Sequence, residues 1–205
     1  LRRASPSKGN ARGMPRAFSF QMEIMVTEDA RFWDRIADKY SKSPISNEDV
    51  YQRKLTMTQD RLRSDMHILE FGCGTGGTAL AHAPHVAQVH AIDVSSRMIE
   101  IARAKQADAG IENVTFEVSG IDAFDPSAVS YDAILGLSVL HLVEDPAQII
   151  RKAAGMLKPG GYFITSTFAA QDQARWLKFI APIGKALGKF PPVLKSFSLD
   201  DLRAW

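Results

Sequence analysis

The feature that most constrains the fold of this chain is the alternation of short apolar runs with helical patterns. Five apolar runs have the length and composition of strands, at residues 66–71, 86–92, 114–118, 131–137 and 162–167. Helical patterns stand between them at residues 76–83, 96–109 and 145–157, the second closed by Gly110. Strand–helix–strand units form right-handed crossovers and therefore a parallel sheet with helices on both faces. The sequence predicts a doubly wound α/β fold.

Two further helices are expected before the sheet. Between residues 28 and 40, apolar side chains recur at spacings of three and four, which gives a helix one apolar face. A second helix is expected to begin after Ser46 or Asn47, either of which can cap it, and to run to about Leu62. Residues 22–65 are therefore interpreted as N-terminal lid helices, and residues 66–168 as the core.

The composition indicates one soluble domain. The chain has 205 residues, of which 45% are hydrophobic and 23% charged. No apolar run approaches the roughly 18 residues of a spanning helix, and a cytoplasmic location is expected. Cys73 is the single cysteine, which excludes an internal disulfide and a cysteine-cluster metal site. No metal is expected.

The charge distribution separates the start of the chain from the rest. Five basic residues and no acidic one lie within the first twenty positions, while the whole chain has a formal net charge of +2. The remainder therefore carries −3, which argues against nucleic acid as a partner. Residues 1–21 are predicted to be a disordered leader, and residues 22–205 a single domain.

A glycine-rich turn follows the first predicted strand. Gly72, Gly74 and Gly76 let the backbone approach a ligand closely, because no Cβ intervenes and positive φ costs little. In doubly wound sheets, ligands bind at the carboxyl ends of the strands, where the strand order reverses. The same segment also satisfies the spacing of dinucleotide enzymes through Gly77, so by itself it indicates only a nucleotide-type pocket.

An acidic residue ends the second predicted strand. Asp93 can accept hydrogen bonds from both ribose hydroxyls of a nucleoside, and the alternative is a role in capping the next helix. An acid at this place fits a nicotinamide cofactor as well.

The segment Ile68–Gly77 resembles the first motif of class I S-adenosylmethionine-dependent methyltransferases of the small-molecule type. The resemblance implies a Rossmann-like sheet, and roles in binding the methionyl part of the cofactor for Glu70, Gly72, Gly74 and Gly76. It also implies that Cys73 lines the turn through its backbone and is not a nucleophile.

The other motifs that carry the resemblance follow in order. Asp93 would bind the ribose, with Val94 and Met98 beside the adenine, although spacing alone equally allows Met98 in the core. Ile121 would supply an N–H to the adenine edge and Asp122 would reach its amine; the alternative for Asp122 is a surface acid. Leu137 and Ser138 would lie beside the transferable methyl group. Tyr40 would fold over the cofactor carboxylate, and Trp33 would line the same lid; the alternative for Tyr40 is a core aromatic.

His141 is the candidate general base, since an unperturbed pKa of about 6.5 suits proton transfer near neutrality. The alternative is a histidine that packs near the strand end and orders its loop. The resemblance implies transfer of a methyl group from S-adenosylmethionine to a small molecule by in-line displacement, leaving S-adenosylhomocysteine. The alternatives are a phospholipid or other lipid acceptor, and a cofactor-binding protein without transferase activity.

Residues 169–197 are interpreted as a lid over the acceptor. Their apolar and lysine-rich composition fits a hydrophobic or anionic substrate, and equally a peripheral membrane contact through residues 176–195. Residues 198–205 have the pattern of the helix that precedes the last sheet-edge element of the family. With that element absent, the fifth strand would be an open edge, so we expect either a longer natural chain or a partner such as a second copy.

Overall fold

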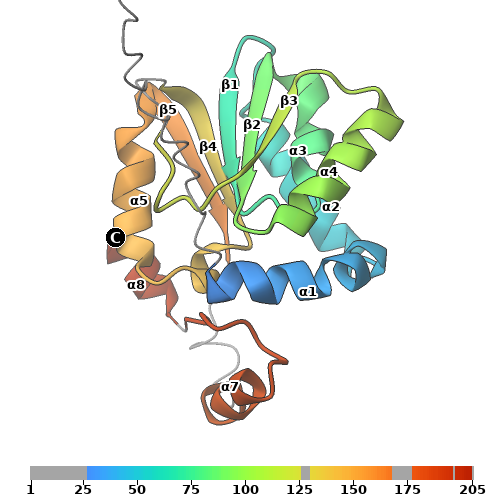
Figure 1. The fold of residues 1–205 in the computed structure, drawn as a ribbon. Helices are drawn as coiled ribbons and strands as arrows, with labels where there is room; N and C mark the ends of the chain where they lie inside the picture. The colour runs from blue at the N-terminus through green and yellow to red at the C-terminus, as the bar shows by residue number, and fades with distance from the viewer. Residues whose placement is uncertain (1–26, 126–129, 168–176, 196, 205) are drawn as a thin grey trace, which may run out of the picture.

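The computed structural model describes residues 27–125, 130–167, 177–195 and 197–204. Five parallel strands form one sheet in the order β3-β2-β1-β4-β5 (Figure 1). They are β1 (His67–Phe71), β2 (Gln88–Asp93), β3 (Val114–Val118), β4 (Tyr131–Leu137) and β5 (Leu157–Ser166). β1 lies between β2 and β4, so the chain winds first to one side of β1 and then to the other. The predicted doubly wound α/β fold is confirmed.

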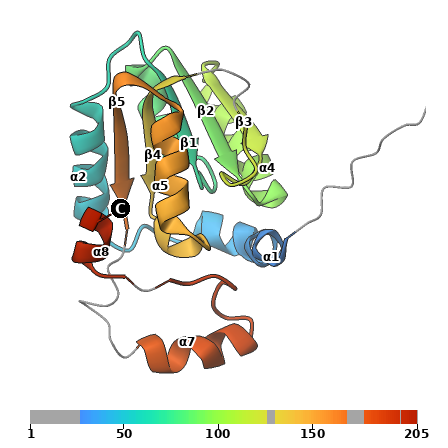
Figure 2. The same cartoon turned by 90° about the vertical axis from the view of Figure 1, so that its left-hand side faces the viewer.

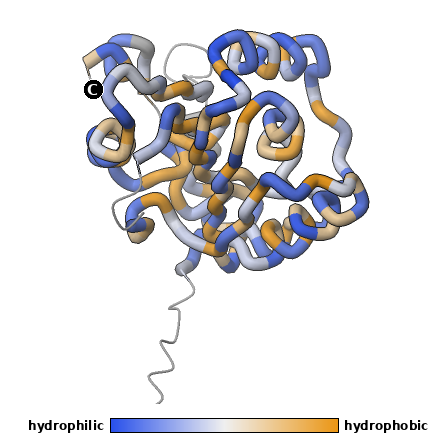
Figure 3. Tube along the Cα trace, turned by 90° about the horizontal axis from the view of Figure 1, so that it is seen from above, coloured by the Kyte–Doolittle hydropathy of each residue, from blue (hydrophilic) through white to orange (hydrophobic). Residues whose placement is uncertain are grey.

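Helices cover both faces of the sheet, as the alternation along β1 requires. Ile68 packs in a core with Ala79 of α3 (Gly77–His82) and Ala102 of α4 (Ser96–Ala109). Leu69 points to the opposite face and packs in a second core with Ile149 of α5 (Pro146–Gly155). Figure 3 shows the hydrophobic residues concentrated toward the middle of the molecule, inside the outer helices.

The two predicted N-terminal helices are present as α1 (Glu28–Lys42) and α2 (Glu48–Gln59). Thr27 and Asn47 cap them by accepting hydrogen bonds from the backbone N–H groups of Ala30 and Val50, at 3.2 and 3.1 Å. α1 crosses the carboxyl end of the sheet (Figure 1) and buries Phe32.

α1 is fixed to the start of α4 by polar contacts. Asp34 accepts hydrogen bonds from the Ser95 hydroxyl at 2.6 Å and from the Arg97 backbone N–H at 3.0 Å. The Arg97 guanidinium also pairs with Asp38 at 2.7 Å. We refer to these contacts of Asp34 and Asp38 with the start of α4 as the α1–α4 clamp.

Several predicted boundaries need correction. α2 ends at Gln59 rather than near Leu62. β2 begins at Gln88 rather than Val86, because the Val86 N–H bonds back to Ala83 O in the preceding turn. The largest difference is β5, which begins at Leu157 rather than Tyr162. Tyr131 pairs with Leu157 and Ala133 with Tyr162, so the predicted turn is a bulge within a longer strand.

The C-terminal part contains α7 (Leu177–Ala186) and α8 (Leu199–Ala204), the latter as predicted (Figure 2). The connection between them contacts the body. Gly188 O accepts from Arg35 at 2.9 Å, and the Lys195 N–H donates to His141 O at 2.7 Å. β5 is the edge of the sheet, as expected. The predicted leader, residues 1–21, and residues 169–176 of the predicted lid lie outside the described residues. Among those described, no helix is long and apolar enough to cross a membrane.

Candidate functional site

One large cavity opens at the carboxyl ends of β1 and β4. Its volume is about 1830 Å³, well above the roughly 300–1,000 Å³ of an ordinary ligand pocket, so it has room for two small molecules side by side. Twelve of the fourteen site residues predicted from the sequence line it: Tyr40, Gly72, Cys73, Gly74, Asp93, Val94, Met98, Ile121, Asp122, Leu137, Ser138 and His141. Glu70 and Gly76 are not among the lining residues.

The three glycines of the turn have different local roles. All have positive φ, at 64°, 53° and 76° for Gly72, Gly74 and Gly76. A Cβ on Gly72 would collide with the side chain of Val139, and one on Gly76 would lie 2.8 Å from Ala102 Cβ and Phe116 Cζ. A Cβ on Gly74 would meet nothing within 4 Å, and Gly74 lines the cavity. Gly74 is thus where a ligand has room to approach the backbone, whereas Gly76 is required for packing.

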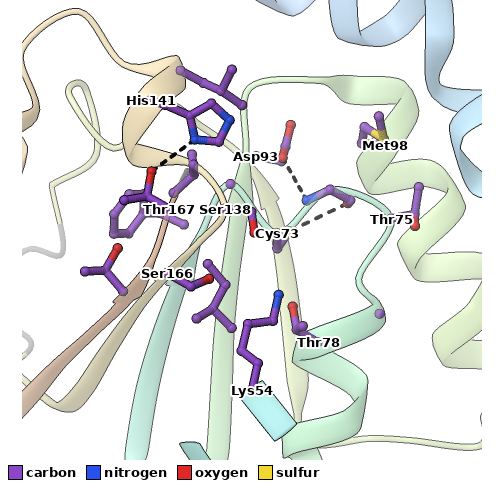
Figure 4. Close-up of a pocket in the computed structure, with 18 of the residues that line it drawn as sticks. Lys54, Cys73, Thr75, Thr78, Asp93, Met98, Ser138, His141, Ser166 and Thr167 are labelled. Atoms are coloured by element: carbon purple, nitrogen blue, oxygen red, sulfur yellow. Dashed lines mark hydrogen bonds between the residues drawn. The ribbon is translucent and has the colours of Figure 1, made fainter. Parts of the chain in front are cut away.

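Asp93 ties the end of β2 to the glycine turn. Its Oδ2 accepts from the Gly74 N–H at 2.8 Å, the dashed line at Asp93 in Figure 4. Its Oδ1 accepts from the Ser95 N–H at 2.9 Å. Burial raises the pKa of this carboxyl, and the two backbone N–H groups act in the opposite direction. Each carboxylate oxygen can accept a second hydrogen bond, and Asp93 lines the cavity, so the carboxylate keeps the capacity to accept the two hydroxyls of a ribose. Helix capping is done by Ser95, which accepts from the Met98 N–H at 3.0 Å.

Glu70 lies behind the turn rather than in the cavity. It is 2% exposed, and its Oε1 accepts a hydrogen bond from the Thr78 hydroxyl. Within the described part of the chain, Oε2 has no hydrogen-bond partner. Burial raises the pKa of Glu70 to about 7, against the lowering effects of Thr78 and of the nearby Lys54 charge. The role in binding the methionyl group that the resemblance implied for Glu70 stays a prediction.

Ser138 has an unusual backbone at the end of β4. Its φ is 60°, a region that non-glycine residues seldom occupy, and it is exposed on the cavity wall. The conformation is held by a 2.7 Å hydrogen bond from its N–H to Ser166 O. Strained residues of this kind cluster at ligand sites, which favours the predicted place of Ser138 beside the reacting group.

His141 lies in the short 3-10 helix η2 (Leu140–Leu142) and faces the cavity. Its Nδ1 is 3.1 Å from the Thr167 hydroxyl (Figure 4), and burial lowers the pKa of the ring. A neutral imidazole oriented in this way can accept a proton. Because Lys195 also binds its carbonyl, both readings of His141, as base and as loop-ordering residue, remain predictions.

The predicted adenine side of the cavity is apolar. Met98 and Ile121 are 2% and 6% exposed, and both still line the wall. A Cβ on Gly120 would collide with the Asp122 carboxyl, which folds back over this position. Asp122 therefore occupies the space of the missing side chain.

The aromatic residues of α1 lie at the cavity rim. Tyr40 is 53% exposed, so the alternative of a core aromatic is wrong. Its ring meets that of Trp33 edge-on, with the ring centroids 6.5 Å apart. Sequence reasoning missed Tyr51, Lys54 and Ser166, which also line the cavity. Helical spacing in α2 could have revealed the first two. Tyr51 lies four residues before the buried Leu55, and Lys54 lies four residues before the buried Thr58, so each is on the side of the helix that faces the body. Among the described residues, no group of three or more metal-ligating side chains is present.

A parallel sheet with a glycine turn and a buried acid at its switch point defines an α/β domain built to bind a nucleoside cofactor. The family model of the methyltransferase domain matches residues 62–186, more than half of the chain. The chain belongs to this family, as a class I S-adenosylmethionine-dependent methyltransferase domain.

Individual relatives agree. A ubiquinone biosynthesis O-methyltransferase of Xanthomonas axonopodis pv. citri is 37% identical over 142 residues, covering 67% of this chain and 59% of the relative. The uncharacterized methyltransferase YcgJ of Bacillus subtilis is 30% identical over 142 residues, covering 69% of this chain and 55% of the relative. The chain thus spans little more than half the length of these relatives.

Solved structures share the fold. The crystal structure of YcgJ superposes with a TM-score of 0.65 at 25% identity, over 75% of this chain and 65% of that chain. The DhpI–SAH complex superposes with a TM-score of 0.58 at 22% identity, over 69% of each chain, which concerns the fold alone.

Proposed function

We propose that this protein transfers a methyl group from S-adenosylmethionine to a small-molecule acceptor. The observation that carries the proposal is the continuity of the cavity. A single space runs from Gly74 and Asp93, where a nucleoside fits, to Ser138 and His141 at the end of β4. Its volume of about 1830 Å³ leaves room for an acceptor next to the cofactor.

The chemistry needs alignment above all. The sulfonium supplies an activated methyl group when the cofactor is bound, and the thioether leaves as a neutral group. Holding an acceptor atom about 3 to 3.5 Å from the methyl carbon supplies roughly 7–11 kcal/mol of the barrier. Asp93 and the glycine turn would hold the nucleoside, and Ser138 would border the methyl group. His141 would take the proton of a hydroxyl acceptor, which the O-methyltransferase relative favours.

The acceptor would carry an apolar part. The α2 side of the cavity presents Val50 and Met57, 61% and 56% exposed, and Ile45 lies at the same rim. Apolar side chains gathered at an opening are typical of a surface that receives a ligand.

The first test is calorimetry with S-adenosylmethionine on the wild type and an Asp93→Ala variant. Two hydrogen bonds to a charged acceptor are lost, so affinity should fall about 100-fold. Asp108→Ala, which removes an exposed acid of α4 that does not line the cavity, is the matched control and should retain the wild-type affinity. Absence of binding by the wild type, together with binding of a nicotinamide dinucleotide, would contradict the proposal.

A lipid acceptor is the second candidate, because Ile183 of α7 and Leu187 just after it are 63% and 64% exposed, next in sequence to Lys185 and Lys189. A labelled-methyl assay over extracts, divided into lipid and water-soluble fractions, separates the candidates. Label in the water-soluble fraction supports a small molecule, and label in the lipid fraction supports a lipid. Cofactor binding without any labelled product would support a non-catalytic protein.

A further inference from the structure

Helix α2 carries a lysine on the face that it turns toward the cavity. Lys54 lies on one side of the helix with Tyr51 and Thr58, at spacings of three and four residues, and Thr58 is buried against the body. The Lys54 side chain is half-buried and lines the cavity. Figure 4 shows it extending from α2 toward the glycine turn, beside Thr78.

The Lys54 ammonium lacks a bonded anion. Within the described part of the chain, its close contact is the ring of Tyr51, 5.4 Å from Nζ to the ring centroid, and it forms no ion pair. Burial lowers the pKa of Lys54, while the charge of Glu70 has the opposite effect. Two other cations of the cavity wall have protein acceptors: Lys105 donates to the Thr75 hydroxyl at 2.9 Å, and Arg61 to Met57 O at 2.8 Å. Arg53 also lines the cavity, but it is exposed to solvent, whereas Lys54 is half-buried. A half-buried cation without an acceptor is costly unless a ligand supplies one.

The position of Lys54 identifies the part of the ligand that it would meet. Asp93 and Lys54 lie on opposite sides of Cys73 in the glycine turn (Figure 4). On the Lys54 side, the Tyr51 hydroxyl lies 3.7 Å from the place of a Cβ on Gly77, so this face of α2 covers the start of α3. With its ribose on Asp93, a nucleoside that extends its 5′ substituent across the turn would bring the end of that substituent to Lys54. In S-adenosylmethionine that substituent ends in the molecule's one carboxylate.

We infer that Lys54 binds the carboxylate of the methionyl group and that Tyr51 positions the lysine. This inference rests on the proposed function and assigns to α2 a role that the resemblance implied for Tyr40. Tyr40 lies at the rim, whereas Lys54 lies in the cavity wall and carries the opposite charge to the carboxylate. Recognition of the amino-acid end would then come from α2, and recognition of the nucleoside from the glycine turn and Asp93.

The experiment compares two ligands on three proteins by calorimetry. S-adenosylhomocysteine has the amino-acid group, and 5′-methylthioadenosine has the same nucleoside and thioether without it. Lys54→Met keeps the apolar stem and removes the charge. Arg53→Met is the matched control, because Arg53 is the neighbouring cation, is exposed and lines the same cavity.

Lys54→Met should bind S-adenosylhomocysteine about 10- to 100-fold more weakly than the wild type, the effect of one hydrogen bond between charged groups. Its affinity for 5′-methylthioadenosine should be unchanged, and Arg53→Met should match the wild type with both ligands. Equal thermal unfolding of the variants and the wild type checks that α2 keeps its place.

Three results would overturn the inference, and they differ from a failure of the proposed function. Unchanged binding of S-adenosylhomocysteine by Lys54→Met would mean that the cation serves another anion, such as one on the acceptor. Equal losses for both ligands would mean that Lys54 merely supports α2. In both cases the wild type still binds the cofactor product and the proposed function stands. A wild type that binds neither ligand would remove the proposed function, and this inference with it.

Discussion

The two walls of the cavity are built in opposite ways. On the glycine-turn wall, backbone N–H groups of Gly74 and Ser95 are bonded to Asp93, and Gly76 is packed against Phe116. On the α2 wall, Lys54 has no bonded anion within the described chain, and Val50 and Met57 are exposed. α2 is attached mainly through buried Leu55 and Thr58, and through a 3.3 Å hydrogen bond from Gln59 to Ala81 O.

The difference shows where the polar groups of each wall obtain their hydrogen-bonding partners. On the turn wall the protein itself supplies the partners, so this wall is preorganised for a ligand. On the α2 wall, Lys54 gains its partner when a ligand binds. Substitutions in the first wall should therefore change the free energy of unfolding. Substitutions in the second should change ligand affinity and leave unfolding nearly unaffected.

Gly76→Ala should have the largest effect on stability. A Cβ at this position meets Ala102 and Phe116 at 2.8 Å and has to adopt a φ of 76°. Overpacking and backbone strain together should lower the free energy of unfolding by about 3 kcal/mol. Gly74→Ala, with positive φ and open space, should lose only about 1 kcal/mol. Urea unfolding measures both; equal losses would show that packing does not distinguish the two glycines.

Glu70→Gln should change how stability depends on pH. Burial raises the pKa of Glu70 from its ordinary 4.5 to about 7 in the folded protein. Between these values the folded protein keeps a proton that the unfolded chain has lost, so wild-type stability should fall as the pH rises through this window. The full loss is about 3 kcal/mol.

The variant has no carboxyl to titrate at this site. Its unfolding free energy relative to the wild type should therefore increase between about pH 5 and about pH 8. Urea unfolding at several pH values measures this difference. A difference that stays constant over the range would mean that Glu70 is ionised throughout, with its unbonded oxygen hydrated.

Val50→Ser on α2 should have the smallest effect on stability. Val50 is 61% exposed, so the free energy of unfolding should change by no more than about 0.5 kcal/mol. Leu55→Ala on the buried side of the same helix is the contrast, with an expected loss of about 2 kcal/mol. A loss above about 1 kcal/mol for Val50→Ser would show that α2 is as firmly built into the body as the turn.

Much of the fold follows from local patterns. α4, β3 and β4 have the predicted bounds, because apolar periodicity and end signals such as Gly110 act within a few residues. The start of β5 was missed, since Pro159 and Gly160 indicate a turn, and only pairing with β4 reveals the bulge.

Site residues could be predicted from the sequence where they belong to a recognised motif. Asp93 and Gly74 were found in this way, and both line the cavity. Sequence could not separate Gly74 from Gly76, because Phe116, which packs on Gly76, comes from a distant strand. Lys54 belongs to no motif that was recognised, and its place in the wall depends on how α2 packs.

The α1–α4 clamp has a consequence for the newly made chain. Asp34 and Arg97 are 63 residues apart, so α1 is synthesised well before its partner. At about 5–20 residues per second, roughly 3 to 13 s pass before Arg97 is added. During that time Phe32 and the rest of the apolar face of α1 have nothing in α4 to cover them. α1 therefore cannot form the clamp until the chain has been extended at least as far as Arg97.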